Sequence, residues 1–424
     1  MKNPLINFFK RIEPDKKNSP FLHTVYEGFF TLAFTPDHVT SGKGVHIRDG
    51  MDLKRTMVMV VIALQLCYIF GTYNIGHQHF LALGEYQNWW QGIHLKIAYG
   101  LIQLLPIWVV THVVGLGIEF YYSYKRGHGI EEGYLVTGAL IPLIMPPDIP
   151  LWILTLAIVF AVIIGKEAFG GTGMNILNVA LLARVFVFFA YPASISGDEV
   201  WISGLDKVDG RFIGAEYGWA HQFFDSIFKG VGWDTFGAGK QAVVDGFSGA
   251  TPLALAYQGG WEKASAAYTA SDMWWGLIPG SIGETSKPAI IIGALMLIGM
   301  GIASWRIMVS MVLGMSFMGL LLNWWGATPF MEVPWYYHFY MGSFLFAMAF
   351  MATDPVTAAG TQRGKWIYGF LIGAIGLIIR VLNPAYPEGW MLAILFMNVI
   401  APLIDYIVLQ GNMRRRARRA KVQA

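Results

Sequence analysis

Residues 56–76 read TMVMVVIALQLCYIFGTYNIG, a stretch that contains no Asp, Glu, Lys or Arg. Its length matches the ~20 apolar residues that a helix needs to cross a bilayer. The whole chain shares this character, because 55% of its 424 residues are hydrophobic and only 13% are charged. That charged share is about half the ~25% typical of soluble domains. The sequence therefore predicts an all-α polytopic membrane protein rather than two or three soluble domains.

Further apolar runs follow along the chain, so that about ten transmembrane helices are expected. After the first run, they cover residues 97–123, 133–145, 150–165, 176–191, 287–303, 306–325, 336–352, 365–382 and 389–409. The runs 133–145 and 150–165 are short, and the sequence MPPDIP (145–150) separates them.

Lys and Arg in the short connections indicate how the chain is oriented. They occur in the N-terminal arm, in the second, fourth, sixth and eighth connections, and in MRRRARRAK from Met413. Because cytoplasmic loops carry the excess of basic residues, both termini are expected in the cytoplasm and the segment 192–286 outside. The lysines of that segment are compatible, since loops beyond ~60 residues escape the charge rule.

This topology divides the chain into five parts. They are a cytoplasmic N-terminal arm (1–55), a first five-helix repeat (56–191), a large periplasmic loop (192–286), a second five-helix repeat (287–409) and a basic cytoplasmic tail (410–424). An odd number of helices per repeat would invert the second half, as in many transporters. Asn178-Val is echoed by Asn398-Val, and the pattern Met-x-x-Asp ends at both Asp148 and Asp354. The echo is short, so a chance match is the alternative.

Several kinds of protein are excluded by the same sequence. The single cysteine, Cys67, rules out a disulfide framework and cysteine-ligated clusters. The formal net charge of +3 is too balanced for a nucleic-acid-binding face. Neither G-x-x-x-x-G-K-[ST] nor G-x-G-x-x-G occurs, so no nucleotide phosphate cradle is encoded. The ten histidines lack a pairing that would indicate haem.

The segment 192–286 contains the sequence DGFSGAT (245–251), followed by Pro252. Its small residues leave one hydroxyl, that of Thr251, sterically open. An ordinary surface turn, in which Ser and Thr bond their own backbone, would have the same composition.

DGFSGAT resembles the D-x-x-S-G-A-T signature at which a flavin transferase joins FMN to the Thr hydroxyl through a phosphoester. The signature belongs to the membrane-protein family of the B subunit of Na+-translocating NADH:quinone oxidoreductase and the D subunit of the RNF complex. Other stretches similar to this family are GKEAFGGTGMNILN (165–178), FFAYPASISGD (188–198), GSIGE (280–284), MGIASWRI (300–307), MATDPV (351–356) and RVLNPAYPEGWMLAILF (380–396). The N-terminal arm with HIRDGMDLKR is more similar to the B-type branch. The resemblance implies that Thr251 carries FMN and that Asp245, Ser248, Gly249 and Ala250 complete the motif.

The resemblance also implies a function. Electrons would arrive from partner subunits, reach covalent FMN outside, pass to noncovalent riboflavin within this chain and end on ubiquinone, while Na+ moves from cytoplasm to periplasm. The expected partners are subunits of the A, C, D, E and F types and, during maturation, the flavin transferase. The expected location is the bacterial inner membrane. We assign no catalytic side chain and no metal ligand to this chain.

By the same resemblance, Asn178 corresponds to an asparagine that contacts riboflavin, and Ala139 and Leu143 occupy neighbouring contact positions. The following residue is Val179, where relatives often have Pro. A structural alternative is that a buried Asn joins helices by hydrogen bonds.

Glu119 and Asp405 match family acids that are associated with sodium uptake. Ionisable groups at membrane depth are costly, and carboxylate oxygens suit hard cations. The alternative is that water solvates them near the cytoplasmic helix ends, or that Arg184 and Arg380 are structural ion-pair partners.

The resemblance places the quinone near the cytoplasmic end of the second span, around Gly115, Leu116 and Gly117, together with the N-terminal arm. The paired glycines of the family appear here as Gly115-Leu116, a departure at the second position. Close helix packing would also explain Gly115 and Gly117.

Two other functions remain open from the sequence. One is that of an RNF-type D subunit, which exchanges electrons with ferredoxin and NAD partners. The other is a channel or secondary transporter without redox activity, which the inverted repeat alone would suggest.

Overall fold

The computed structural model describes residues 11–15, 18–33, 53–126, 133–195, 201–208, 211–214, 216–236, 243, 249–383 and 388–423. Within these residues, six helices are long and apolar enough to cross a membrane. They are α3 (Leu53–Ala82), α4 (Ile93–Arg126), α6 (Leu151–Gly165, with the 3-10 turn Glu167–Phe169), α12 (Trp305–Trp325), α14 (Gln362–Leu382) and α15 (Trp390–Gln423). The chain is therefore a multi-pass membrane protein, as its composition predicts.

Three of the expected spans are shorter helices in the structure. They are α5 (Tyr134–Ile144), α7 (Val179–Ala190) and α11 (Lys287–Gly299). At 1.5 Å per residue, the 11 residues of α5 rise about 16 Å, roughly half of a ~30 Å hydrocarbon core. The two prolines after Met145 help to end α5, because the ring of Pro disfavours helical backbone in the residue before it. Half-length helices bring helix ends, with their unpaired backbone groups, inside the protein.

The expected eighth span, 336–352, is not a continuous helix. It consists of a 3-10 segment (Trp335–Phe339), one turn of α13 (Phe344–Phe346) and a π-helical turn (Ala347–Met351). Gly342 separates the first two with a φ of +67°, a conformation that ends regular helix. An added Cβ at Gly342 would also come within 2.9 Å of the Arg380 guanidinium. The backbone conformation and the close approach of Arg380 both favour glycine at the point where the helix is interrupted.

The segment 192–286 is more structured than its Gly- and Ser-rich composition suggests. It contains a 3-10 turn (Pro192–Ser194), α8 (Trp219–Val231), α9 (Pro252–Ala267) and α10 (Ala270–Trp275). It also contains an antiparallel hairpin of β1 (Leu205–Val208) and β2 (Arg211–Gly214), in which Leu205 pairs with Gly214. The hairpin departs from the all-α expectation. The Asp-Gly sequence between Val208 and Arg211, a dipeptide typical of hairpin connections, indicates it.

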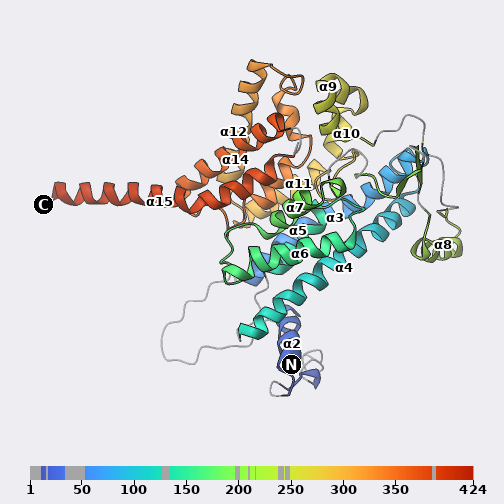
Figure 1. Ribbon diagram of the computed structural model, residues 1–424, viewed down its shortest axis with the longest axis horizontal. Helices are drawn as coiled ribbons and strands as arrows, with labels where there is room; N and C mark the ends of the chain where they lie inside the picture. Colours follow the sequence, from blue (N-terminus) through green and yellow to red (C-terminus); the bar gives the residue numbers. More distant parts are fainter. Residues whose placement is uncertain are drawn as a thin grey trace.

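Two groups of helices lie next to each other with the short helices between them (Figure 1). α3, α4 and α6 pack together on one side, and α12, α14 and α15 pack together on the other. α7 contacts both α6 and α15, and α11 contacts α3. The N-terminal helix α2 (Pro20–Ala33) packs against α4, and α15 extends beyond the helical body as a continuous helix through the basic tail. The inverted five-helix repeats and the orientation of the chain remain predictions.

Candidate functional site

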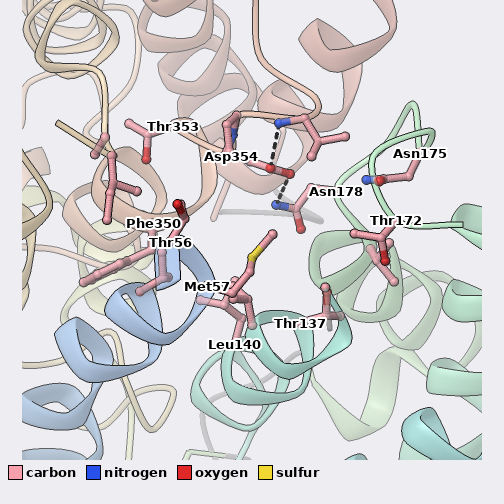
Figure 2. Close-up of a pocket in the computed structure, with 18 of the residues that line it drawn as sticks. Thr56, Met57, Thr137, Leu140, Thr172, Asn175, Asn178, Phe350, Thr353 and Asp354 are labelled. Carbon is pink, nitrogen blue, oxygen red and sulfur yellow. Dashed lines mark hydrogen bonds between the residues drawn. The ribbon is translucent and has the colours of Figure 1, made fainter. Parts of the chain in front are cut away.

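A cavity of about 90 Å³, lined by apolar side chains and by a cluster of polar ones, lies where the two groups of helices meet (Figure 2). It is called the polar cavity below after that cluster. It is bounded by the first two turns of α3, by α5, by the connection before α7, by the end of α11 and by the residues around 350–356. The residues that line it are Thr56, Met57, Val60, Gly133, Val136, Thr137, Leu140, Lys166, Thr172, Asn175, Asn178, Val179, Leu297, Ile302, Ala303, Phe350, Thr353, Asp354, Pro355 and Val356. The cavity thus combines residues that are far apart in the sequence.

Asn178 and Asp354 contact each other in the wall of this cavity (Figure 2). Asn178 caps α7, because its Oδ1 accepts a hydrogen bond from the Leu181 N–H at 3.2 Å. Its Nδ2 donates to Asp354 Oδ2 at 3.4 Å (Figure 2). Asp354 also accepts from the Val356 N–H at 3.1 Å and from the Thr357 hydroxyl at 3.0 Å. Burial raises the pKa of the Asp354 carboxyl, and these three hydrogen bonds oppose that effect.

Asn398 joins the same group from α15. With its amide oriented to satisfy both of its groups, Asn398 accepts from the Asn178 backbone N–H at 3.2 Å and donates to the Tyr368 hydroxyl at 2.7 Å. Asn178 and Asn398 are the two asparagines of the sequence echo. The structure therefore places the echoed positions in contact at the junction between the two groups of helices.

Lys166 contributes a positive charge to the cavity wall. Its Nζ donates to Glu119 Oε1 at 2.5 Å, and both side chains are almost fully buried. A second ion pair of 2.9 Å, between Arg126 and Glu167, lies one residue further along the same connection. Glu119 of α4 is thus paired with Lys166, and not with the arginines that the sequence suggested.

Those two arginines have other partners. Arg184 Nη1 donates to Glu284 Oε1 at 2.5 Å, and both side chains are buried. Arg380 lies 4.0 Å from Glu388 and donates to the Met341 carbonyl at 3.0 Å. Both arginines therefore tie helices to irregular segments, α7 to the segment before α11 and α14 to the segment around Gly342.

Asp405 lies outside the cavity and stabilises the start of α14. Its carboxylate accepts from the Gly360 N–H at 2.6 Å, from the Thr361 N–H at 3.0 Å and from the Thr361 hydroxyl at 2.5 Å. Its side chain is only half-buried. The structure does not bring Glu119 and Asp405 together, so any shared role would use two separate positions.

The three expected quinone residues divide between two environments. Leu116 and Gly117 line an apolar groove of about 1040 Å³ between α3 and α4, together with Trp108 and His112. An added Cβ at Gly117 would meet no atom within 4 Å. Gly115 faces the other way, where a Cβ would overlap the Tyr134 ring. Gly115 is therefore a packing residue, and Gly117 is open to the groove.

Ala139 and Leu143 do not line the polar cavity. The Ala139 carbonyl accepts from the Tyr68 hydroxyl at 2.6 Å, and Ala139 borders the groove between α3 and α4. Leu143 is buried against Gly283, whose N–H donates to the Leu143 carbonyl at 2.7 Å. The face of α5 that lines the cavity instead contains Val136, Thr137 and Leu140. Of the three expected riboflavin residues, Asn178 is the one that the structure places in the cavity wall.

The end of the DGFSGAT motif lies at the start of α9. Asp245 and Ser248 fall outside the described residues. Gly249 has a φ of +62°, which favours glycine, and Ala250 is buried with its carbonyl accepting from the Tyr268 hydroxyl at 2.9 Å. Thr251 is the N-cap of α9, and its Oγ1 accepts from the Ala254 N–H at 3.2 Å. The Thr251 hydroxyl is thus fixed in position and only partly buried.

Sequence reasoning missed Lys166 and Asp354 as members of the cavity. Both stand in stretches that resemble the family, GKEAFGGTGMNILN and MATDPV. A charged residue at the end of an apolar run is the signal that could have identified them. The hydroxyl groups of Thr137 and Thr353 carried no such signal.

The cavity wall offers hydrogen-bonding groups of the kinds that the edge of a flavin ring can use. Carboxamides of Asn175 and Asn178, hydroxyls of Thr137 and Thr353, and the Lys166 ammonium offer donors and acceptors among apolar walls. Ligand pockets usually reach about 300–1,000 Å³. At about 90 Å³ the cavity must widen for a ring system, and Met57, which points into its centre (Figure 2), is the side chain best able to move.

The family model and similar curated proteins indicate the same family. The family model described as "NQR2, RnfD, RnfE family" matches residues 40–414. A protein of Chromohalobacter salexigens, named as the B subunit of a Na(+)-translocating NADH-quinone reductase, is 41% identical over 416 residues, which cover 94% of this chain and 91% of that protein. Proteins with the same name are 40% identical in Yersinia pestis, covering 98% of this chain and 100% of the relative, and 39% identical in Haemophilus influenzae, covering 98% and 99%.

Proposed function

The chain belongs to the NQR2, RnfD, RnfE family, and from that premise we propose that it is the B-type subunit of a Na+-translocating NADH:quinone reductase. In this function it carries electrons from a covalent FMN through riboflavin to ubiquinone, coupled to Na+ transport from cytoplasm to periplasm. The observation that carries the proposal is 39–41% identity over nearly the whole chain to proteins named as the B subunit of that enzyme. The N-terminal arm is included in the longest of these matches, which favours the B-type branch over an RNF-type D subunit.

Thr251 is the proposed attachment point of FMN. A flavin transferase needs a hydroxyl that is accessible and close to small residues, and Thr251 is partly buried beside Gly249 and Ala250. A phosphoester there keeps the charged phosphate at the first turn of α9, where helix N-termini favour anions. The attachment site thus stays outside the hydrocarbon region in the expected topology.

The polar cavity is the proposed riboflavin site. Bound riboflavin would accept electrons and pass them on. Asn178 and Asn175 would bind the polar edge of the ring, Val136 and Leu140 would exclude water from its faces, and Lys166 would place a positive charge near it. Since riboflavin carries no phosphate, a site with a single lysine is sufficient.

The groove between α3 and α4 is the proposed quinone site, since it is apolar and includes Leu116 and Gly117.

We expect Gly115→Ala to destabilise the fold by about 1–3 kcal/mol, because the new methyl group overlaps the Tyr134 ring. Gly117→Ala should leave thermal stability within about 0.5 kcal/mol of the parent but raise the KM for ubiquinone. Differential scanning fluorimetry and steady-state quinone reduction would measure both effects. An unchanged KM in stable Gly117→Ala and Gly117→Leu variants would exclude the groove.

Glu119 and Asp405 are the proposed residues of the sodium path. An amide keeps the shape and oxygen of a carboxylate but loses its charge, so Glu119→Gln and Asp405→Asn should weaken sodium activation of quinone reductase activity. A rise of about tenfold in the half-saturating Na+ concentration corresponds to about 1.4 kcal/mol. The assay uses the assembled complex with normal flavin content, and it also tests the proposed function as a whole.

The ion pair of Glu119 with Lys166 requires a control. Glu119→Gln leaves a buried ammonium unpaired, which destabilises by about 3–5 kcal/mol, whereas removing both charges is often nearly neutral. The double variant Glu119→Gln with Lys166→Met should therefore recover stability and keep the sodium defect. If the double variant recovers normal sodium dependence, Glu119 has only a structural role.

The same proposal places the chain in the bacterial inner membrane with both termini in the cytoplasm. Its partners would be A, C, D, E and F-type subunits, ubiquinone and Na+. The distribution of Lys and Arg supports this orientation.

A further inference from the structure

Helix α8 (Trp219–Val231) has an apolar stripe that no described part of the chain covers. Trp219, Phe223, Ile227 and Val231 follow one another at intervals of four residues, and they are 82%, 57%, 45% and 62% exposed. At about 100° per residue these four side chains share one side of the helix. Four large apolar side chains on one exposed side indicate a non-aqueous neighbour.

The two other sides of α8 pack against the protein and carry polar side chains, respectively. His221, Phe224 and Phe228 pack inward, with the His221 ring 5.5 Å from Tyr99 and the Phe228 ring 5.0 Å from His94. Polar side chains occupy the remaining side, and they are Gln222, Asp225, Ser226 and Lys229. The helix thus has one side on the protein, one polar side and one exposed apolar side.

Contacts with the first turn of α4 hold the C-terminal end of α8 in place. His94, in the first turn of that spanning helix, contacts the Trp233 ring at 5.0 Å and the Asp234 carbonyl at 3.1 Å. α8 therefore lies beside the point where α4 enters the bilayer, at the end of the α3–α4 pair remote from α2 (Figure 1).

The start of α4 also has exposed apolar side chains. Trp90 is 81% exposed just before α4, and Ile93 and Ile97 on its first turns are 38% and 39% exposed. Such side chains face lipid in a spanning helix. The exposed stripe of α8 thus belongs to a helix that packs against the apolar end of a spanning helix.

We propose that α8 lies in the membrane interface at the end of the bilayer where α4 begins, which is the outer leaflet in the proposed orientation, with its apolar stripe in the boundary between headgroups and acyl chains. Helices with one apolar and one polar side bind in this way, and Trp is concentrated at that depth. The polar side with Gln222 and Lys229 faces water, and the inward side anchors the helix to α4. The segment 192–286 is held by its helix α8 at a fixed height against the bilayer, independently of any flavin.

Site-specific photocross-linking of the whole complex in native membranes tests this placement. p-Benzoylphenylalanine would replace Phe223 or, as a second position on the stripe, Ile227. Its matched control would replace Gln222 on the polar side of the same helix. After irradiation, mass spectrometry of the peptides would identify the adducts.

We expect phospholipid adducts at 223 and 227 with a yield at least about tenfold above that at 222. Cross-links from both stripe positions to another protein of the complex would overturn the proposal and identify a protein partner instead. Equal lipid yields at 222 and 223, or no adduct at either stripe position, would show that the stripe faces water and would equally overturn it.

Discussion

Replacing Thr251 with alanine should abolish the covalent flavin of this chain completely. The phosphoester needs the Thr251 hydroxyl, and alanine offers no oxygen in its place. The fluorescent band in a denaturing gel should disappear, and the intact mass should fall by one FMN minus water as well as by the side-chain change. Quinone reductase activity of the assembled complex should be lost, because electrons can no longer pass from the outer flavin.

Thr251→Ser is the matched control for this experiment. Serine keeps a hydroxyl and can still accept from the Ala254 N–H as N-cap of α9. Alanine also removes that cap, at about 1 kcal/mol, which is too little to unfold the chain or to explain a total loss of flavin. A fluorescent band in Thr251→Ala would assign the flavin to another residue. Absence of any covalent flavin in the parent chain would instead favour a non-redox transporter.

Asn178→Ser should release the noncovalent flavin while the fold remains intact. Serine caps a helix as well as asparagine does, so its hydroxyl oxygen can accept the hydrogen bond from the Leu181 N–H that the Asn178 side chain now accepts. The carboxamide that faces the cavity beside Asp354 is lost. An unsatisfied or missing buried hydrogen bond costs about 1–3 kcal/mol, or roughly tenfold to hundredfold in flavin affinity.

The measurement is the flavin content of the purified complex after acid precipitation, with thermal stability as the fold control. Asn178→Asp gives a second test, because it keeps the cap but places a carboxylate within 3.4 Å of Asp354. Both variants should lose the released flavin and retain the covalent one. If both hold riboflavin at the parent level, Asn178 serves only to join α7 to its neighbours.

Composition and apolar runs were sufficient to predict a multi-pass helical protein, because bilayer burial imposes one length and one chemistry on every spanning helix. They were insufficient for the run 336–352, where Gly342 separates two short helical segments and Arg380 binds the Met341 carbonyl beside it. Hydropathy alone cannot distinguish a spanning helix from an irregular segment buried among other helices. The hairpin and helices of 192–286 were missed for the opposite reason, since Gly-rich composition obscured short local patterns.

The candidate site was predictable where a polar residue stands at the start of a helix. Asn178 stands directly before an apolar run and caps α7, as its sequence position indicates. Ala139 and Leu143 were placed on the correct helix, but they lie on faces away from the cavity. The rotation of α5 about its axis depends on what packs around it, and one sequence does not contain that information.

Ion pairing was the least predictable feature. Glu119 and Lys166 are separated by 47 residues, and nothing local connects them. Arg184 and Arg380 were equally reasonable partners from the sequence, yet each binds a carboxylate from an irregular segment. Pairing of buried charges follows from tertiary contacts, because each charge must find whichever opposite charge the fold brings within reach.

Chromatographic flavin analysis of the purified, acid-precipitated parent chain tests the central claim most directly, namely that this protein carries two chemically different flavins. We expect one equivalent of FMN in the protein pellet, on the peptide that contains Thr251, and one equivalent of riboflavin without phosphate in the supernatant. A pellet free of flavin, or a supernatant that contains FMN or FAD in place of riboflavin, would contradict the account.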